Sequence, residues 1–353
     1  MVLHPLFGHR EARSRLAAAF RSRRLPQVLL VTGPVGIGKQ RFALWLAQLL
    51  LCEAPTEEPC GRCRACRRVL DLGHPDLHWF IPIARPKAGE PDRQVEEAAE
   101  LLAEALSARR ERPFSEPGDG MGFHPIASVR LLLRRAGLTP VEGARKVFVV
   151  GEADRLVPQE SNPEAANALL KFLEEPPLDT WVVLTTTEAE RVLPTIRSRV
   201  VPVRLSRLPD VEVRAFVEAV IRPAGEEAIA ALVRLADGAV GGLAGDGEAG
   251  SERGSRAVTE ARAFLASLEH GPGGRLERAL RQLPWSARGG FTELLDAVAR
   301  ELSEQARTAA SRDRVESVAE ALHRVATARE EAQRNVNPQL LLADLANELA
   351  EVL

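Results

Sequence analysis

Two groups of residues in this chain have the types and spacing of chemical sites, and the first is a phosphate-binding loop. The run Gly33-Pro34-Val35-Gly36-Ile37-Gly38-Lys39 follows the apolar run Val28–Val31 and precedes a helix-like segment that begins near Phe42. A loop of this pattern between a strand and a helix holds phosphate groups with its backbone N–H groups, and its lysine adds a positive charge. The candidate nucleotide-binding residues are therefore Gly33, Gly36, Gly38 and Lys39.

The same region lacks the residues that normally hold Mg²⁺. Gln40 stands where a Ser or Thr hydroxyl would bind the ion. Gly151 follows the strand-like run Val147–Val150, where an Asp carboxylate is usual. Glu152 lies at the position of a catalytic base, but without a metal site it is interpreted as a structural or solvated carboxylate. The sequence leaves ATP or ADP binding open and predicts that this chain does not hydrolyse ATP.

The second group is a set of cysteines that we call the cysteine module, residues 52–66. Its members are spaced x7, x2 and x2 and are Cys52, Cys60, Cys63 and Cys66. Four thiolates this close can form a closed tetrahedron around a structural Zn²⁺. An iron–sulfur cluster is the alternative, but Arg67 follows the last cysteine in place of the x3-Cys-Pro continuation of ferredoxins. The spacing therefore favours zinc.

Two arginines lie beside a serine in the segment Thr195–Val200. An arginine at such a place usually forms a surface salt bridge. In an oligomeric nucleotide-binding protein, it can instead reach the phosphate of a neighbouring subunit. Arg199 is the candidate for that role, and Arg197 is the natural comparison.

The elements expected to position these groups form an α/β part followed by helices. Strand-like runs at 28–31, 77–81, 146–150 and 181–186 alternate with helical segments, which predicts a parallel sheet. After Leu205 the pattern is helical throughout, with a flexible linker expected at 241–255. Residues 85–123 are interpreted as a solvated surface insertion. The predicted domains are 1–205, 206–250 and 256–353.

Composition narrows the class of protein. At 353 residues the chain exceeds the size at which one core keeps growing. Its net charge of −2 gives no overall attraction to nucleic acid, so any DNA contact requires a local patch. Residues 1–14 contain no apolar signal region, and no run of eighteen uncharged apolar residues occurs. We expect a cytoplasmic protein with no membrane partner.

Taken together, the motifs resemble the δ′ family of bacterial DNA polymerase III clamp-loader subunits, which are AAA+ proteins. The resemblance covers nearly the whole chain, and its family-wide motif Ser-Arg-Cys appears here as Ser198-Arg199-Val200. His74-Pro75-Asp76 and the degraded metal positions favour δ′ over the γ/τ ATPase subunit of the same machine. The parts that carry the resemblance are Gly33–Lys39, the cysteine module, Gly73–Asp76, Lys146–Asp154, Asn167–Pro177, Ser198-Arg199 and the tail Asn335–Leu353.

The resemblance implies a RecA-like α/β domain, a small helical lid and a C-terminal helical collar. It implies a non-hydrolysing stator, with γ/τ and δ subunits as partners, in the ring that loads the sliding clamp onto primed DNA. Such a chain is a component of a DNA-directed DNA polymerase, a nucleotidyltransferase. Arg199 would complete the ATP site of an adjacent γ/τ subunit as an arginine finger in trans. The lid position of an ATPase's sensor arginine falls within Gly238–Gly242, which contains no arginine.

Two other classes of protein remain as alternatives. A catalytically active ATPase, such as γ/τ itself or a helicase motor, would need Ser or Thr at position 40 and Asp at position 151. A free-standing zinc-containing DNA-binding protein would be expected to have a basic domain. The residues present at those positions and the nearly balanced charge argue against both.

Overall fold

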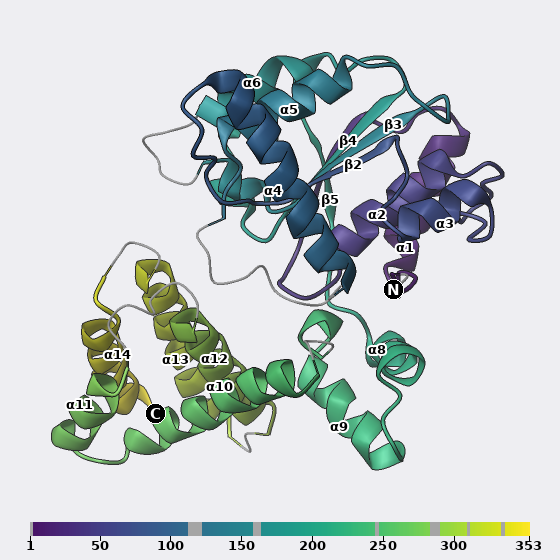
Figure 1. Cartoon of the computed structure of the whole chain (residues 1–353). Coiled ribbons are helices and arrows are strands. Elements are labelled where there is room, and N and C mark those ends of the chain that lie inside the picture. Colours follow the sequence, from purple (N-terminus) through teal and green to yellow (C-terminus); the bar gives the residue numbers. More distant parts are fainter. Residues whose placement is uncertain are drawn as a thin grey trace. The chain divides into compact units, whose positions relative to one another are not determined.

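The structure, a computed structural model, describes residues 3–111, 122–157, 164–243, 247–282, 290–308, 311–332 and 336–353. The chain divides into two compact units, Met1–Asp246 and Gly247–Leu353 (Figure 1). Each unit has its own buried apolar core. Among the described residues, no helix is both long enough and apolar enough to cross a membrane.

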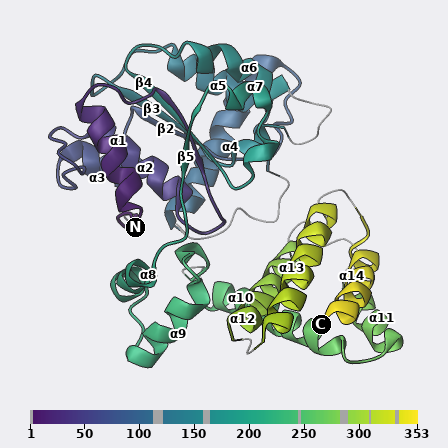
Figure 2. The same ribbon diagram turned by 180° about the vertical axis from the view of Figure 1, so that it is seen from behind.

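The first unit combines a sheet with helices on both of its faces (Figure 1, Figure 2). Its elements in chain order are α1 (Arg10–Arg21), β1 (Val28–Thr32), α2 (Lys39–Leu51), α3 (Arg64–Leu70), β2 (Leu77–Phe80), α4 (Pro91–Glu111), α5 (Ile126–Ala136), β3 (Lys146–Val150), η1 (Ala153–Leu156), α6 (Glu164–Glu174), β4 (Thr180–Thr186), η2 (Ala189–Arg191), α7 (Pro194–Arg197), β5 (Val201–Arg204), α8 (Asp210–Phe216), η3 (Val217–Ile221), α9 (Glu226–Ala236) and η4 (Val240–Gly242).

The sheet has the strand order β2-β3-β4-β1-β5, and all of its strand pairs are parallel. Val28 of β1 lies opposite Val182 of β4, and Lys146 of β3 lies opposite Thr180 of β4. β3 is buried along its whole length, as expected for a strand covered on both faces. The carboxyl ends of β1, β3 and β4 meet at one edge, so the segments that follow β1 and β3 are brought together there.

The predicted parallel α/β architecture with a helical remainder is confirmed, and the structure adds one strand to it. β5 was not predicted, because its sequence Val-Pro-Val-Arg is mostly exposed and is interrupted by Pro202. A proline is tolerated on an edge strand because it removes no hydrogen bond from the interior of the sheet. β5 pairs with β1 and forms one edge of the sheet.

The predicted solvated insertion at 85–123 is corrected in part. Residues 112–121 lie outside the described residues, but α4 lies within them and has one buried face. Val95, Ala98 and Leu102 of α4 are buried in the main core, at the i, i+3, i+7 spacing of a helix face. Charges on the other faces of α4 had dominated the sequence pattern. This helix packs against α5 and belongs to the fold.

Within the first unit, residues after Leu205 form a small separate cluster. Its buried members are Leu208, Val213, Phe216, Val217, Val233, Ala236 and Val240. This cluster coincides with the predicted lid, although the boundaries of the three predicted domains stay predictions. The prediction of a linker at 241–255 is wrong from Gly247 onward, because a helix begins at that residue.

The second unit is wholly helical over its described residues. Its elements are α10 (Gly247–Ser267), α11 (Pro272–Leu280), α12 (Gly290–Thr308), α13 (Arg312–Ala332) and α14 (Pro338–Val352). α12 packs against α10 and α13, and α14 packs against α11 and α13. Fully buried Phe291 and Leu342 lie in the core that these helices share. The unit has the helical character expected of a collar.

Candidate functional site

The phosphate loop has the backbone shape that its sequence predicts. It connects β1 to α2, and three of its glycines have positive φ angles, namely 150° at Gly33, 75° at Gly36 and 93° at Gly38. Gly38 is the N-cap of α2. A Cβ at Gly33 would lie 2.4 Å from the carbonyl oxygen of Leu205, so the close approach also requires glycine there. The loop is therefore a glycine-dependent turn between β1 and α2, as its sequence predicts.

Lys39, the cationic residue of the loop, is bonded to the loop itself. Its Nζ donates to the carbonyl oxygens of Gly33 and Pro34, at 2.9 and 2.6 Å. The side chain is buried, and this burial lowers the pKa of Lys39 to about 8, although the carboxylates of Asp154 and Glu152 act in the opposite direction. The charge that would neutralise a phosphate is satisfied internally.

The position of the missing magnesium ligands is filled by a side chain. A Cβ built on Gly151 would lie 3.2 to 3.3 Å from the amide atoms of Gln40, so the two residues are in direct contact. The amide nitrogen of Gln40 donates to a carboxylate oxygen of Glu152 at 3.4 Å. Burial raises the pKa of Glu152, which disfavours the charged form that a catalytic base needs. The two departures from the ATPase pattern, Gln40 and Gly151, are thus in contact with each other.

Segments near both ends of the first unit contact the phosphate loop. The backbone N–H of Gly241 in η4 donates to the carbonyl oxygen of Gly36 at 2.8 Å. The ring Nε2 of His9, taken as the protonated nitrogen, donates to the carbonyl oxygen of Ile37 at 2.8 Å. Burial lowers the pKa of His9, so the ring is neutral near pH 7. The segment Gly238–Gly242, which contains no arginine, thus makes backbone contact with the loop.

Replacing Gly241 by Ala should destabilise this contact. The added Cβ would lie 2.8 Å from Gly36 Cα and 3.0 Å from its carbonyl oxygen, and both are backbone atoms that cannot rotate away. We expect the free energy of unfolding in urea to fall by about 1–3 kcal/mol, the usual cost of overpacking. Gly89→Ala is the control, because a Cβ there meets nothing within 4 Å. Equal stability of the two variants would show that the lid does not contact the loop as described.

Arg199 follows α7 and is held at the surface by neighbouring oxygens. Its Nε lies 2.6 Å from Oε1 of Glu174, and Nη2 also contacts that carboxylate. Its Nη1 donates to the carbonyl of Thr195 at 2.6 Å. The nearby Arg197 pairs instead with Glu190. Both arginines are about one-third exposed, at 31% and 34% of their side chains, so exposure alone does not distinguish them.

The four cysteines are brought together as predicted. Their Sγ atoms all lie within 4.8 Å of one another, and those of Cys60 and Cys66 are 3.9 Å apart. Two sulfurs of a tetrahedral site with Zn–S bonds of about 2.3 Å would be about 3.8 Å apart. Backbone N–H groups of Arg62 and Cys63 lower the pKa of Cys60 to about 6, which favours its thiolate, whereas burial raises the pKa of Cys52 and of Cys66. The donor set fits a metal ion.

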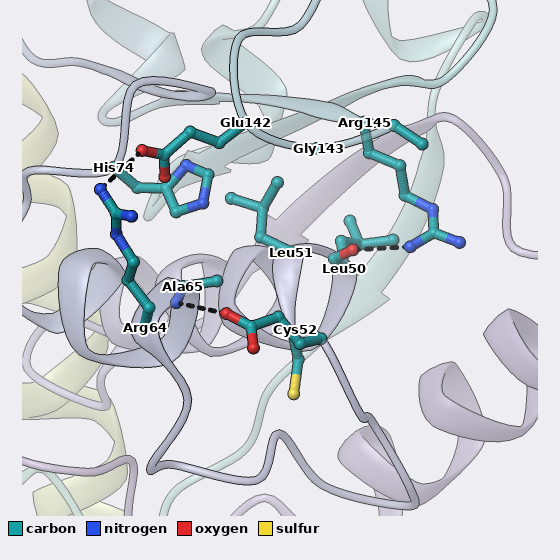
Figure 3. A pocket seen from close by; sticks show the side chains of 11 residues that line it. Leu50, Leu51, Cys52, Arg64, Ala65, His74, Glu142, Gly143 and Arg145 are labelled. Atoms are coloured by element: carbon teal, nitrogen blue, oxygen red, sulfur yellow. Dashed lines mark hydrogen bonds and ion pairs between the residues drawn. The ribbon is translucent and has the colours of Figure 1, made fainter.

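The cysteine module is attached to the sheet through Glu142, which sequence reasoning did not single out. Arg64 and Arg68 of α3 both form ion pairs with this carboxylate, and Figure 3 shows the pair made by Arg64. The loop that contains Glu142 is fixed in turn by buried Asp76, which accepts hydrogen bonds from the backbone N–H groups of Val141, Glu142 and Gly143 at 2.6, 2.9 and 3.2 Å. Asp76 of the His74-Pro75-Asp76 motif therefore has a structural role.

A cavity of about 220 Å³ lies between the module and this loop. Several of its polar groups are paired with one another. Arg145 donates to the Leu50 carbonyl (Figure 3), and the backbone N–H of Ala65 donates to the Glu53 carboxylate. The described lining thus joins α3 to the loop that precedes β3. The contacts of Glu142 help to orient α3, since a change in this residue would remove the ion pairs of two arginines at once.

Known proteins resemble this chain over much of its length. A subunit δ′ of DNA polymerase III from Bacillus subtilis is 32% identical over 176 residues, 50% of this chain and 41% of that protein. The Escherichia coli δ′ subunit is 28% identical over 297 residues, 81% of this chain and 74% of that protein. A γ/τ subunit from Mycobacterium bovis is 30% identical over 235 residues, 65% of this chain and 34% of that protein.

A solved structure of a DNA polymerase III γ-subunit-related protein from Thermotoga maritima aligns with a TM-score of 0.33 at 19% identity, over 78% of this chain and 95% of that one. The chain spans less than half of the length of the Bacillus and Mycobacterium relatives. The sequence profile of the family described as "DNA polymerase III, delta subunit" matches residues 8–209 of the 353. Because this match covers more than half of the chain and is accompanied by relatives named δ′, the chain belongs to this DNA polymerase III family as a δ′-type member.

Proposed function

We propose that this chain is a δ′ subunit that acts as a non-hydrolysing stator of a clamp loader. In this role it assembles with γ/τ and δ subunits and helps them place a sliding clamp on primed DNA. One observation carries the proposal: Gln40 fills the space beside Gly151 where a metal-binding carboxylate would stand, while Arg199 is kept at the surface. A chain with its own catalytic site filled and a surface arginine retained is suited to serve a neighbour's site.

In the proposed assembly, Arg199 is the arginine finger for the ATP of an adjacent γ/τ subunit. A guanidinium is planar and always charged, and it matches the oxygens of a transferring phosphoryl group. Charge on that group grows toward the transition state, so a fixed cation there lowers the barrier more than it strengthens ground-state binding. Arg199 and Arg197 are nearly equally exposed, so the choice of Arg199 rests on its place in the Ser198-Arg199 pair.

The assembly itself can be tested by mixing the purified chain with γ/τ and δ subunits and weighing the product by native mass spectrometry. The proposal expects one copy of this chain in each complex. The active-ATPase alternative instead expects a γ/τ-like chain that can replace γ/τ, so several copies per ring or rings of this chain alone would contradict the stator role.

The purified chain alone should turn over no ATP. Gln40 and Gly151 supply neither the hydroxyl nor the carboxylate that position Mg²⁺. The Gln40 side chain also occupies the space beside Gly151. The measurement is phosphate release in the presence of Mg²⁺ and ATP. Turnover that disappears in the Lys39→Ala variant would show that the site is active. Contaminating ATPases are recognised because Lys39→Ala leaves their activity unchanged.

We further propose that the metal of the cysteine module is a structural Zn²⁺. Cys52, Cys60, Cys63 and Cys66 would hold it as thiolates, because their number and separations suit a closed tetrahedral site. When bound, the ion would crosslink the segment between α2 and α3. Backbone N–H groups of Cys60, Cys63 and Cys66 already donate to sulfur atoms of the module, at 3.3 to 3.4 Å. These contacts orient the thiolates without further polar side chains.

A further inference from the structure

The contacts of Arg199 point to a second residue in the proposed trans-acting site. Glu174 is the last residue of α6 and lies 25 positions before Arg199 in the chain. One oxygen of its carboxylate receives both Nε and Nη2 of the arginine. The opposite corner of the guanidinium, Nη1, is bonded to the Thr195 carbonyl and lies 3.1 Å from Ser198 Oγ. The guanidinium is therefore oriented from two sides.

The position of Glu174 is not explained by the stability of its own helix. A carboxylate in the last turn lies at the negative end of the helix dipole, where cations are favoured and anions are disfavoured. The adjacent Glu175 is also exposed, and its side chain has no hydrogen bond or ion pair within the described part of the chain. Of the two neighbouring carboxylates, only Glu174 contacts the arginine, so its contact is specific.

Two effects of this contact on the arginine oppose each other. Glu174 can hold Arg199 back from a neighbour's phosphate, or it can fix the guanidinium so that less freedom is lost when the phosphate is engaged. Side-chain exposures of 31% for Arg199 and 45% for Glu174 mean that water screens their attraction. An exposed pair of this kind changes an equilibrium by about fivefold at most. An arginine finger changes turnover on the order of 10³-fold, which is much more. Restraint of Arg199 by Glu174 is therefore the weaker effect.

We propose that Glu174 is a positioning residue for Arg199, orienting the guanidinium toward the γ-phosphate of ATP bound to the adjacent subunit. This inference rests on the proposed role of Arg199 in trans. The carboxylate touches neither ATP nor the reacting atoms and acts only through the arginine. Its effect is therefore expected in the turnover number of the neighbour's site, with little change in the ATP concentration for half-maximal rate.

The test uses complete loaders assembled with γ/τ and δ subunits, and measures steady-state ATP hydrolysis with clamp and primed DNA present. Glu174→Ala should lower the turnover of the site served by this chain about two- to fivefold, because the freed arginine must be ordered in each cycle. Glu174→Gln, which keeps one acceptor oxygen, should lie between Glu174→Ala and the unmodified chain. Glu175→Ala, the neighbouring carboxylate, should leave turnover unchanged.

Coupling to the arginine separates positioning from a general structural role. Glu174→Ala combined with Arg199→Ala should be no slower than Arg199→Ala alone, because both changes remove the same interaction. The thermal stability of Glu174→Ala should equal that of Glu175→Ala. A purely structural role would instead make Glu174→Ala less stable and would slow turnover further in the absence of Arg199.

The outcomes distinguish the two proposals. If Arg199→Ala lowers turnover while Glu174→Ala leaves it unchanged or raises it, the positioning role is wrong and the finger assignment stands. If Arg199→Ala has no effect on turnover, the proposed function of Arg199 is wrong, and the inference about Glu174 fails with it.

Discussion

Zinc should remain bound to the purified chain at about one ion per molecule, and Cys66→Ser should remove it together with the local structure of residues 52–66. Cys66 is fully buried, and its Sγ lies 3.9 Å from that of Cys60. Apparent binding free energies of structural zinc are about 10–16 kcal/mol in small zinc-finger peptides. Here the sheet holds the flanking helices, so we expect only part of that as lost stability.

Elemental analysis of protein purified without added metal measures the ion, and thermal unfolding with and without a chelator measures its effect. Arg62→Ala is the matched control, because this exposed residue lies within the module and is not one of the four ligands. It should keep the zinc and the unfolding temperature. Iron with a visible charge-transfer band, or no metal in the freshly purified chain, would contradict the assignment.

Arg199→Ala should leave the chain folded and able to assemble, yet lower the ATPase rate of the complete loader. Loss of a finger reduces turnover at a single site on the order of 10³-fold. Only the site that faces this chain would lose it, so the decrease in the total rate should be smaller. The contacts of Arg199 with Glu174 and Thr195 lie at the surface, where ion pairs contribute little to stability. Stability should therefore change little.

Arg197→Ala is the control for this prediction, because Arg197 lies two residues away with nearly the same exposure and a different partner, Glu190. It should lower the ATPase rate less than Arg199→Ala. If Arg197→Ala slows the loader while Arg199→Ala does not, the finger assignment is wrong and moves to Arg197. Native mass spectrometry of both variant complexes checks that the rates refer to equal assemblies.

The sheet was largely predictable because its interior strands are continuous apolar runs. β3 has the same bounds in the structure as in the sequence pattern, 146–150. β5 could not be recognised in this way, since an edge strand with exposed residues and a proline has no such run. The apolar face of α4 lies among many charges, and its helical period was the signal that could have shown it.

The candidate site was predictable residue by residue, but its contacts were not. The types at positions 40 and 151 indicate a lost metal site, yet these residues are 111 positions apart and nothing local shows that one side chain fills the space beside the other. The pairing of Arg199 with Glu174 and the anchoring of Glu142 by Asp76 are also long-range contacts. The order of the strands determines which loops lie next to each other, and such pairings follow from it.

The central claim, that this chain acts as a clamp-loader stator, is tested most directly by adding it back to an incomplete loader. Purified γ/τ and δ subunits are mixed with sliding clamp, primed DNA and ATP, and loaded clamps are counted with and without this chain. The account predicts that loading depends on the chain and saturates at one copy per loader. Equal loading in its absence would contradict the account.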